Sequence, residues 1–312
     1  MAPGDALSCW SVTIAPGTDA EVPGFWHGLG LPGLVDVHVH FMPPQVLTKV
    51  WAHFDRLRHS DGRPFWPIAY REDQATRVQR LADMGVRAFS SLIYPHKPGM
   101  AQWLNGWAAH FAAANPRCLR SATFFPEPEA DRYVAEEIDA GARIFKVHLR
   151  VGAYDPRDPL LSPVWRRLEA AGVPVVVHAG SGPQAGEFTG PGPIGEVLET
   201  YPDLALVIAH MGMPEYAAFW EVALRYPNVR LDTTLTFTDF AEHALPGAYP
   251  PKLLESLATH PDRVLLGSDF PNIPHPYAHQ LAALARLGLG EPWLRAVCHD
   301  NAARLFDLGR LD

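Results

Sequence analysis

Features that mark membrane, secreted and disulfide-rich proteins are scarce in this sequence of 312 residues. The three cysteines, Cys9, Cys118 and Cys298, are odd in number and far apart, so we expect neither a disulfide framework nor a Cys-x-x-Cys metal site. No apolar run approaches the roughly 18 residues of a membrane-spanning helix. The N-terminal stretch MAPGDALSCWSVTIAPGTDAE lacks the basic and apolar regions of a signal peptide. We therefore expect a cytoplasmic protein with no membrane partner.

Blocks of like charge are also absent, although the net charge is -8 at pH 7. A basic stripe is the usual mark of nucleic-acid binding, so its absence argues against a nucleic-acid partner. The 31 prolines and 25 glycines are scattered among apolar segments and indicate many loops rather than disorder. With 47% hydrophobic residues, a chain of this length suits two domains or one large α/β barrel.

Short apolar segments rich in β-branched residues recur from residue 34 onward, each followed by a loop and an amphipathic stretch. The eight predicted strands are 34–40, 86–93, 119–125, 144–149, 173–178, 205–210, 229–233 and 264–268. Helices are predicted between them, and a last helix over 292–306 closes the chain. This alternation predicts an α/β fold, the (β/α)8 TIM barrel, over residues 34–312, with residues 1–33 as an extension packed on it. A doubly wound open sheet is the second choice, since it would usually show a Gly-rich phosphate loop after the first strand and none is present.

The segment Asp36-Val37-His38-Val39-His40 ends the first predicted strand. Side chains alternate along a strand, so Asp36, His38 and His40 would share one face, which in a barrel is the lumen. Two imidazoles side by side can chelate one cation. Two hydrogen-bonded core histidines are the alternative, and we place it second because burying both without a ligand would leave polar atoms to satisfy.

Three further candidates lie at the ends of predicted strands: His178 and His210 are the last residues of theirs, and Asp269 directly follows the last strand. Alone, each has an ordinary explanation, since a strand-end histidine is often a surface group and an aspartate is often a helix N-cap. Together they would lie on one rim of the barrel with His38 and His40. Such a set of nitrogen and oxygen ligands suits Zn²⁺ with an open position for water, and Fe²⁺ or Mn²⁺ would also fit.

In these motifs the chain resembles the amidohydrolase superfamily, in particular the amidohydrolase-related branch that includes aminocarboxymuconate semialdehyde decarboxylase. The resemblance covers residues 33–306 and rests on the segments LVDVHVHFMPP, VVVHAG, IAHMG, LLGSDFP and NAARLF, in that order. It implies a barrel of the metal-dependent hydrolase type. The metal ligands would then be His38, His40, His178 and Asp269. His210 would orient or deprotonate the attacking water, and Asp36 would accept a hydrogen bond from a ligand imidazole.

The fourth predicted strand carries Lys146 and His148 on one face, followed by Arg150. In binuclear members of the superfamily a carboxylated lysine on this strand bridges two metals, while the decarboxylating branch usually lacks the lysine, which favours hydrolysis here. We prefer a pairing of Lys146 with an inward carboxylate such as Asp36, because Lys146 lies one pleat below the strand end and a buried ammonium needs a partner. We therefore expect one metal. His148 and Arg150 are placed to bind a substrate carboxylate, with a solvated loop arginine as the alternative for Arg150.

The long segment 41–72 after the first strand contains a cluster of large aromatic side chains. They are Trp51, Phe54, Phe65, Trp66 and Tyr70. This cluster would form a pocket wall for a flat or apolar substrate, a small core of the loop itself, or an oligomer contact, and the sequence leaves all three open.

The predicted site would activate water next to a polarised carbonyl, with Asp269 as the proton acceptor. We therefore expect hydrolysis of an amide, lactam or ester bond of a small molecule. The first alternative is non-oxidative decarboxylation, or hydration, of an unsaturated or aromatic carboxylic acid. A barrel that binds a ligand without turnover is a distant third, because it predicts a broken ligand set and this set is complete. The cofactor would be one divalent metal ion, Zn²⁺ before Mn²⁺ or Fe²⁺, and a homodimer is compatible with the sequence.

Overall fold

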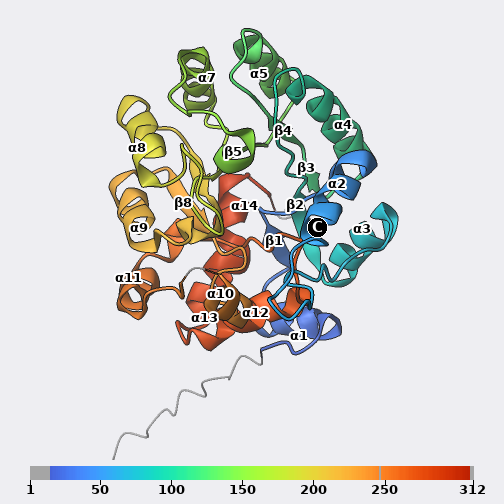
Figure 1. The fold of residues 1–312 in the computed structure, drawn as a ribbon. Helices are drawn as coiled ribbons and strands as arrows, with labels where there is room; N and C mark the ends of the chain where they lie inside the picture. The colour runs from blue at the N-terminus through green and yellow to red at the C-terminus, as the bar shows by residue number, and fades with distance from the viewer. Residues whose placement is uncertain (1–14, 246, 310–312) are drawn as a thin grey trace, which may run out of the picture.

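The predicted strand segments form a parallel sheet whose strands are arranged in a ring (Figure 1). The structure, a computed structural model, describes residues 15–245 and 247–309. The strands in these residues are β1 (Leu34–Asp36), β2 (Val86–Ser90), β3 (Cys118–Leu119), β4 (Ser121–Thr123), β5 (Ile144–His148), β6 (Val175–His178), β7 (Leu206–Ile208), β8 (Val229–Asp232) and β9 (Val264–Leu265).

These strands occupy eight positions around a closed barrel. β3 and β4 are separated only by Arg120 and continue one another, since β3 pairs with β2 and β4 pairs with β5. Parallel pairing then runs without a break from β4 to β9. Three backbone hydrogen bonds beyond the strand ends close the ring between β9 and β1. They join Val37 to Leu266, His38 to Asp269, and His40 to Phe270, with N–O distances between 2.7 and 2.9 Å. The predicted (β/α)8 barrel is confirmed.

Helices cover the outside of the barrel (Figure 1). In chain order they are α1 (Val22–Gly28), α2 (Pro44–Phe54), α3 (Gln74–Asp83), α4 (Ala101–Ala114), α5 (Ala130–Asp139), α6 (Leu149–Gly152), α7 (Ser162–Ala171), α8 (Pro191–Thr200), α9 (Tyr216–Arg225), α10 (Asp239–Ala244), α11 (Leu254–Thr259), α12 (Tyr277–Arg286), α13 (Glu291–Arg295) and α14 (Asn301–Leu305). The closing helix predicted over 292–306 corresponds to α13 and α14, which a π-helical turn joins. None of the described helices has the length and apolar character needed to cross a membrane.

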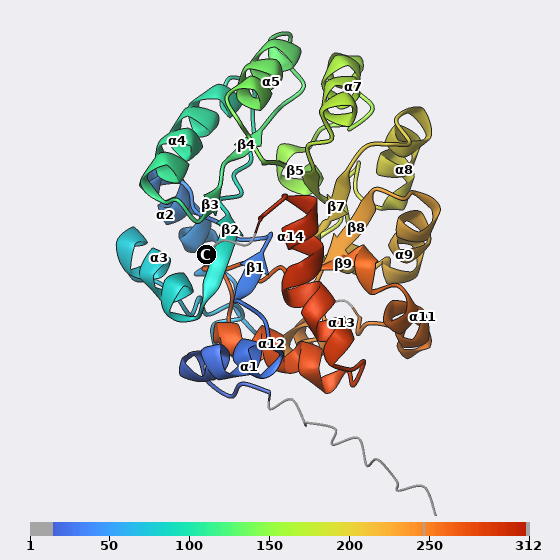
Figure 2. The same ribbon diagram turned by 180° about the vertical axis from the view of Figure 1, so that it is seen from behind.

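The end of the barrel at which the strands begin is filled by the last helix. Figure 2 shows α14 crossing in front of the strands at this end. Ala302 of α14 and the following Phe306 pack in one apolar cluster with Val35, Ile144 and Leu265 from three different strands. Residues that react must therefore lie at the opposite end, where the strands finish.

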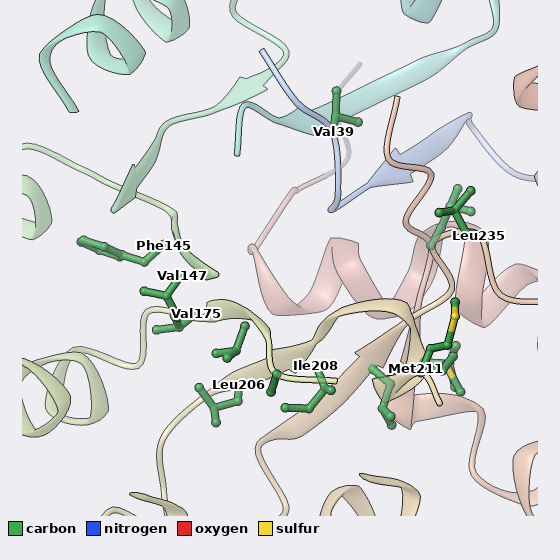
Figure 3. Packing of buried hydrophobic residues seen from close by; sticks show 14 of the residues in the cluster. Val39, Phe145, Val147, Val175, Leu206, Ile208, Met211 and Leu235 are labelled. Atoms are coloured by element: carbon green, nitrogen blue, oxygen red, sulfur yellow. The ribbon is translucent and has the colours of Figure 1, made fainter. Parts of the chain in front are cut away.

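Side chains along β5 alternate between the outer layer and the lumen, as a strand in a barrel requires. Phe145 and Val147 pack in the outer apolar core (Figure 3). Ile144 belongs to the cluster inside the barrel, and Lys146 and His148 line the cavity above it. The strand thus presents a lysine and a histidine inward while its apolar residues hold the helices.

This alternation breaks in β1, and the expected position of Asp36 is wrong as a result. Oδ1 of Asp36 accepts the backbone N–H of His38 at 3.1 Å, which bends the chain at Val37. Val37 and His38 are adjacent but both face the barrel interior. Asp36 points outward instead, where its Oδ2 accepts the hydroxyl of Tyr277 of α12 at 2.9 Å. Within the described residues no hydrogen bond joins the Asp36 carboxylate to a histidine ring, so it holds the bend rather than a ligand.

The described part of the N-terminal segment packs against the barrel beside α12. Phe25 of α1 is buried in the main apolar core. Asp19 accepts the backbone N–H of Ala278 at 2.9 Å, in the first turn of α12, where a carboxylate is favourable. Residues 1–14 of the expected extension, Cys9 included, lie outside the described residues.

Two helices that we did not predict lie in the long loops after the strands. α2 follows β1 and begins with proline at Pro44, which suits a first helical turn. α10 follows β8 and is capped by Thr238, whose side chain accepts the N–H of Ala241 at 3.2 Å. A residue at the start of each helix therefore indicates it in the sequence, but both helices lie in segments whose length suggested irregular loops.

Gly267 allows the last strand to approach the first. A Cβ atom at this position would lie 2.3 Å from Oγ1 of Thr234, 2.9 Å from Cβ of His38 and 3.1 Å from Cβ of Asp232. All three neighbours are buried and have little room to move. The close packing of His38 beside Asp232 therefore depends on the absence of a side chain at residue 267.

We predict that Gly267→Ala lowers the free energy of unfolding by about 1–3 kcal/mol, the usual cost of an extra methyl group in a packed core. The matched control is Gly106→Ala in α4, where an added Cβ meets nothing within 4 Å and alanine favours the helix by about 0.5–1 kcal/mol. Urea unfolding of both variants measures the difference. Equal stability of the two variants would mean that the neighbours of Gly267 yield without cost.

Candidate metal centre

The carboxyl ends of the strands surround a cavity of about 760 Å³. This is the end at which enzymes of this architecture bind their substrates. Most of the residues selected from the sequence line it: His38, His40, Lys146, His148, Arg150, His178, His210 and Asp269. Asp36 is the exception, for the reason given above.

Two imidazoles and one carboxylate converge within this cavity. Oδ1 of Asp269 lies 2.9 Å from Nε2 of His40 and 3.7 Å from Nε2 of His38. One ligand atom from each residue lies within 4.8 Å of the other two. β1 and the residues after it supply both histidines, and the bond from Asp269 N to the His38 carbonyl keeps the carboxylate beside them. Burial would raise the pKa of Asp269, but the neighbouring His40 and His38 bring it below its usual range.

The hydrogen bonds of the two rings turn both Nε2 atoms toward Asp269. Nδ1 of His38 lies 2.8 Å from Oδ2 of Asp232, and Nδ1 of His40 lies 2.8 Å from the Leu92 carbonyl. Both partners can only accept, so each Nδ1 carries a proton and each Nε2 offers a lone pair to Asp269 unless it is protonated too. For His38, burial and the nearby Lys146 lower the pKa to about 3, which disfavours a second proton on this ring. A divalent cation fits this donor set.

Asp232, a residue not selected from the sequence, holds several parts of the centre together. It ends β8 and is fully buried. Besides the His38 ring, it binds the backbone N–H of His210 at 3.0 Å and that of Thr234 at 3.1 Å, both through Oδ1. Burial would raise the pKa of Asp232, but the charge and hydrogen bond of His38 bring it below its usual range. Its place at the end of an apolar strand is the same signal that identified His178.

His178 reaches the cavity but does not join the three converging residues. Its ring stacks on that of His148, with centroids 3.9 Å apart and planes 8° apart, and lies 4.8 Å from the ring of His210. Nε2 of His178 lies 3.2 Å from the Gly182 carbonyl and therefore carries the proton. Burial lowers the pKa of both stacked histidines well below the usual value, so both rings are neutral. To bind a cation through Nε2, His178 would have to leave Gly182.

Lys146 reaches into the centre itself, and it does not make the expected pairing with Asp36. Its Nζ lies 3.5 Å from Nε2 of His38, and the residue is 1% exposed. Burial lowers the pKa of Lys146 to about 8, although the charges of Asp232 and Asp269 act in the opposite direction. Lys146 lies one pleat below the strand end, as expected. The four-carbon stem of its side chain is nevertheless long enough to bring the ammonium up to the level of the ligands.

The backbone is strained at the rim of the cavity. His210 and Asp269 have φ angles of 55° and 69°, in the left-handed region that residues other than glycine rarely adopt. Leu235, which also lines the cavity, has a φ of 58°. Each such residue costs on the order of 1–3 kcal/mol and persists only where its surroundings fix it, as the hydrogen bonds from His210 N and Asp269 N do here. Strain of this kind gathers at functional sites.

Two hydrogen-bond donors also line the cavity near the converging residues. Tyr94, another residue not selected from the sequence, has its ring 5.8 Å from that of His40 and 5.0 Å from that of His148. Burial raises the pKa of the Tyr94 phenol, so it keeps its proton. Nδ1 of His148 accepts the N–H of Val151 at 3.4 Å, which leaves the ring proton on Nε2. The cavity therefore combines lone pairs at one position with donors beside them.

Solved structures share this fold at low sequence identity. An uncharacterised TIM-barrel protein from Bordetella bronchiseptica has a TM-score of 0.68 at 22% identity, covering 88% of this chain and 99% of that one. The 5-carboxyvanillate decarboxylase of Sphingomonas paucimobilis has a TM-score of 0.59 at 19% sequence identity, with the same coverage of both chains. A probable 2-pyrone-4,6-dicarboxylic acid hydrolase from Acinetobacter baumannii has a TM-score of 0.58 at 15% sequence identity, again with that coverage. At these identities the likeness shows the barrel fold and does not choose a reaction.

Sequence comparison identifies the family. None of the curated proteins matches the chain. The family model described as amidohydrolase matches residues 35–308, which include every converging side chain of the site. As the resemblance of its motifs predicted, this chain belongs to the amidohydrolase family.

Proposed function

We propose that the chain is a metal-dependent hydrolase that cleaves an amide, lactam or ester bond of a small anionic molecule. The observation that carries this proposal is the convergence of two imidazole nitrogens, from His38 and His40, and the carboxylate of Asp269 on one position. These three residues would hold one divalent cation, with His178 as the fourth ligand. Zn²⁺ is our first choice, and Mn²⁺ or Fe²⁺ suits the same donors. When bound, such a cation polarises a carbonyl and lowers the pKa of a water molecule from about 15.7 to about 7.

The residues of the chain would move the proton and support the developing charge. The Asp269 carboxylate would accept a proton from the attacking water and return it to the leaving nitrogen or oxygen. His210 is buried beside it, with its ring 5.2 Å from that of His38, and would support the oxyanion of the substrate. Asp232 would keep His38 in the tautomer that presents Nε2.

The charges around the cavity support an anionic substrate. Among the described residues, the cavity is lined by four lysine and arginine side chains, Lys49, Lys97, Lys146 and Arg150, and by one carboxylate, that of Asp269. The chain as a whole has a net charge of -8, so this positive excess is local to the cavity. We assign Arg150 and the Nε2–H of His148 to a carboxylate of the substrate.

Decarboxylation or hydration of an unsaturated or aromatic carboxylic acid is the second candidate. The positive lining favours it as much as it favours hydrolysis, because both substrates would be anions. In a decarboxylase the site would protonate a substrate carbon after CO2 leaves, instead of adding water. The two candidates therefore differ in the fate of water.

We predict hydrolysis when the protein is screened against esters, lactones and amides of carboxylic acids and against aromatic carboxylic acids in ¹⁸O-water. One ¹⁸O atom should appear in the product carboxylate, with no CO2 released, as mass spectrometry of the product and the headspace measures. Asp269→Asn and His210→Asn should fold normally but lose about 10²–10⁴-fold in rate, the typical contribution of a general acid–base group. His243→Asn in α10, outside the cavity, is the matched control.

Release of CO2 with no ¹⁸O in the remaining product would assign decarboxylation instead, and ¹⁸O in a new hydroxyl group would assign hydration. Loss of soluble protein in both active-site variants would mean that Asp269 and His210 are structural. Circular dichroism of each variant separates that outcome from a loss of chemistry.

We predict about one transition-metal ion per chain in protein purified without chelator. Asp232→Asn should weaken metal affinity about 10–100-fold, because it removes the negative charge that fixes the His38 ring. Asp239→Asn is the control, since Asp239 is an exposed carboxylate bound to His279. Elemental analysis and competition with a chelating dye give the content and the affinity. A fully active protein without metal would sink the proposal.

We predict that the site is mononuclear and that Lys146 is a free amine. Its ammonium already offsets one of the two buried carboxylates, Asp232 and Asp269, whereas a carbamate would add a third negative charge and call for a second cation. The measurement is ¹³C NMR of protein equilibrated with ¹³C-bicarbonate, together with the metal content. A carbamate signal accompanied by two metals per chain would refute this prediction and strengthen the hydrolase assignment.

A further inference from the structure

The cavity is much larger than a substrate of one ring requires. A cavity of about 150 Å³ is enough to hold benzene in a protein interior, whereas the volume here is about 760 Å³. Cavities of roughly 300–1,000 Å³ usually enclose ligands of drug size. A reacting group placed against His40 and Asp269 would therefore leave most of the cavity unfilled.

Much of the remaining wall is apolar and comes from the segment after β1. α2 presents Val46, Val50 and Phe54 to the cavity, four residues apart and so on one side of the helix. Leu57 and Phe65 of the following segment continue this surface. All five are only half-buried, so their apolar atoms are left for a ligand to cover.

Trp103 of α4 and Val151 of α6 extend the apolar lining with unusually exposed side chains. Trp103 is 45% exposed and Val151 41%, and only four large hydrophobic side chains in the described residues are exposed to this extent. These two line the cavity, whereas the other two, Leu160 and Leu224, do not. Within the described residues no hydrogen bond engages the Trp103 indole. A large flat side chain with a free face is well suited to stack on a ligand.

The apolar wall is fixed before any ligand arrives. Leu47 of α2 packs in one buried cluster with Met100 and Leu104 at the start of α4, which holds the two helices together. The indole of Trp51 donates a hydrogen bond to Oδ1 of Asn272 at 2.9 Å and ties α2 to the loop after β9. A preformed surface loses little entropy when a ligand binds it.

We propose that the substrate carries a large apolar group, such as a second ring or a hydrocarbon chain, that binds the outer apolar wall formed by α2, residues 57 and 65, and Trp103. This proposal depends on the proposed function only for the position of the reacting carbonyl of the substrate. It adds the class of substrate, a carboxylic acid derivative with one anionic end and one bulky apolar end. The wall belongs to the same cavity as His38 and Asp269, so one molecule can occupy both.

The test compares benzoate with biphenyl-4-carboxylate, which share the carboxylate and the first ring. Binding to the metal-loaded protein is measured by isothermal titration calorimetry. The second ring should raise the affinity at least about tenfold in the wild type. In Trp103→Ala the gain should be less than about threefold, because the second ring no longer has the indole to pack against. Trp103→Phe should retain most of the gain. Leu224→Ala in α9 is the matched control, similarly exposed but outside the cavity, and should keep the wild-type ratio.

An equal ratio of the two affinities in the wild type and in Trp103→Ala overturns the proposal. The proposal is also overturned if the second ring brings no gain in affinity to the wild type. In that case, a dimer seen by light scattering that Trp103→Ala dissociates would identify the wall as an interface between two copies. Failure of the proposed hydrolase function is distinguishable, since neither probe contains a hydrolysable bond. Loss of metal would act on the part that the two probes share and leave the ratio unchanged.

Discussion

The hydrogen bond between the Asp232 carboxylate and the His38 ring decides what the centre of this barrel can do. With its proton directed to Asp232, the neutral His38 ring has a single lone pair left, and that lone pair faces Asp269. The same carboxylate binds the backbone N–H of His210, so the ends of β1, β7 and β8 are fixed relative to one another by one buried group. The absence of a side chain at Gly267 leaves the space in which this contact forms.

The ionisable groups buried at the centre are tolerated because they are paired with one another. Ionised groups in a low-dielectric interior are costly unless they are paired and hydrogen-bonded. Here the backbone bonds that join the last strand to the first place Asp269 beside two imidazoles, and Lys146 supplies a positive charge between the two carboxylates. The strained φ angles of His210 and Asp269 persist for the same reason, since each backbone N–H has a fixed partner. The same backbone hydrogen bonds thus close the sheet and bring Asp269 next to the two histidines.

The barrel could be predicted from the sequence because its signals are local and repeated. Helices lie between the strands as predicted, and each predicted strand overlaps an observed one. The site was predicted only as far as strand ends could be recognised. Asp36 was misplaced because its side chain accepts a neighbouring N–H and breaks the alternation, which periodicity cannot reveal. Asp232 lies at a strand end but in none of the motifs that carry the family resemblance, so nothing in the sequence beyond that position marked it.

Reaction and selectivity are built on different parts of this molecule. The converging groups come from strand ends, where neighbouring strands fix each side chain, so their arrangement tolerates little change. The outer wall comes from α2 and the segment after it, which pack on the main core through side chains such as Phe54, through the cluster around Leu47 and through the Trp51–Asn272 hydrogen bond. Residues such as Val46 and Val50 face the cavity without supporting the strands, so they can change shape and size at little cost to the fold. The substrate is therefore better identified from the helix that covers the centre than from the ligands within it.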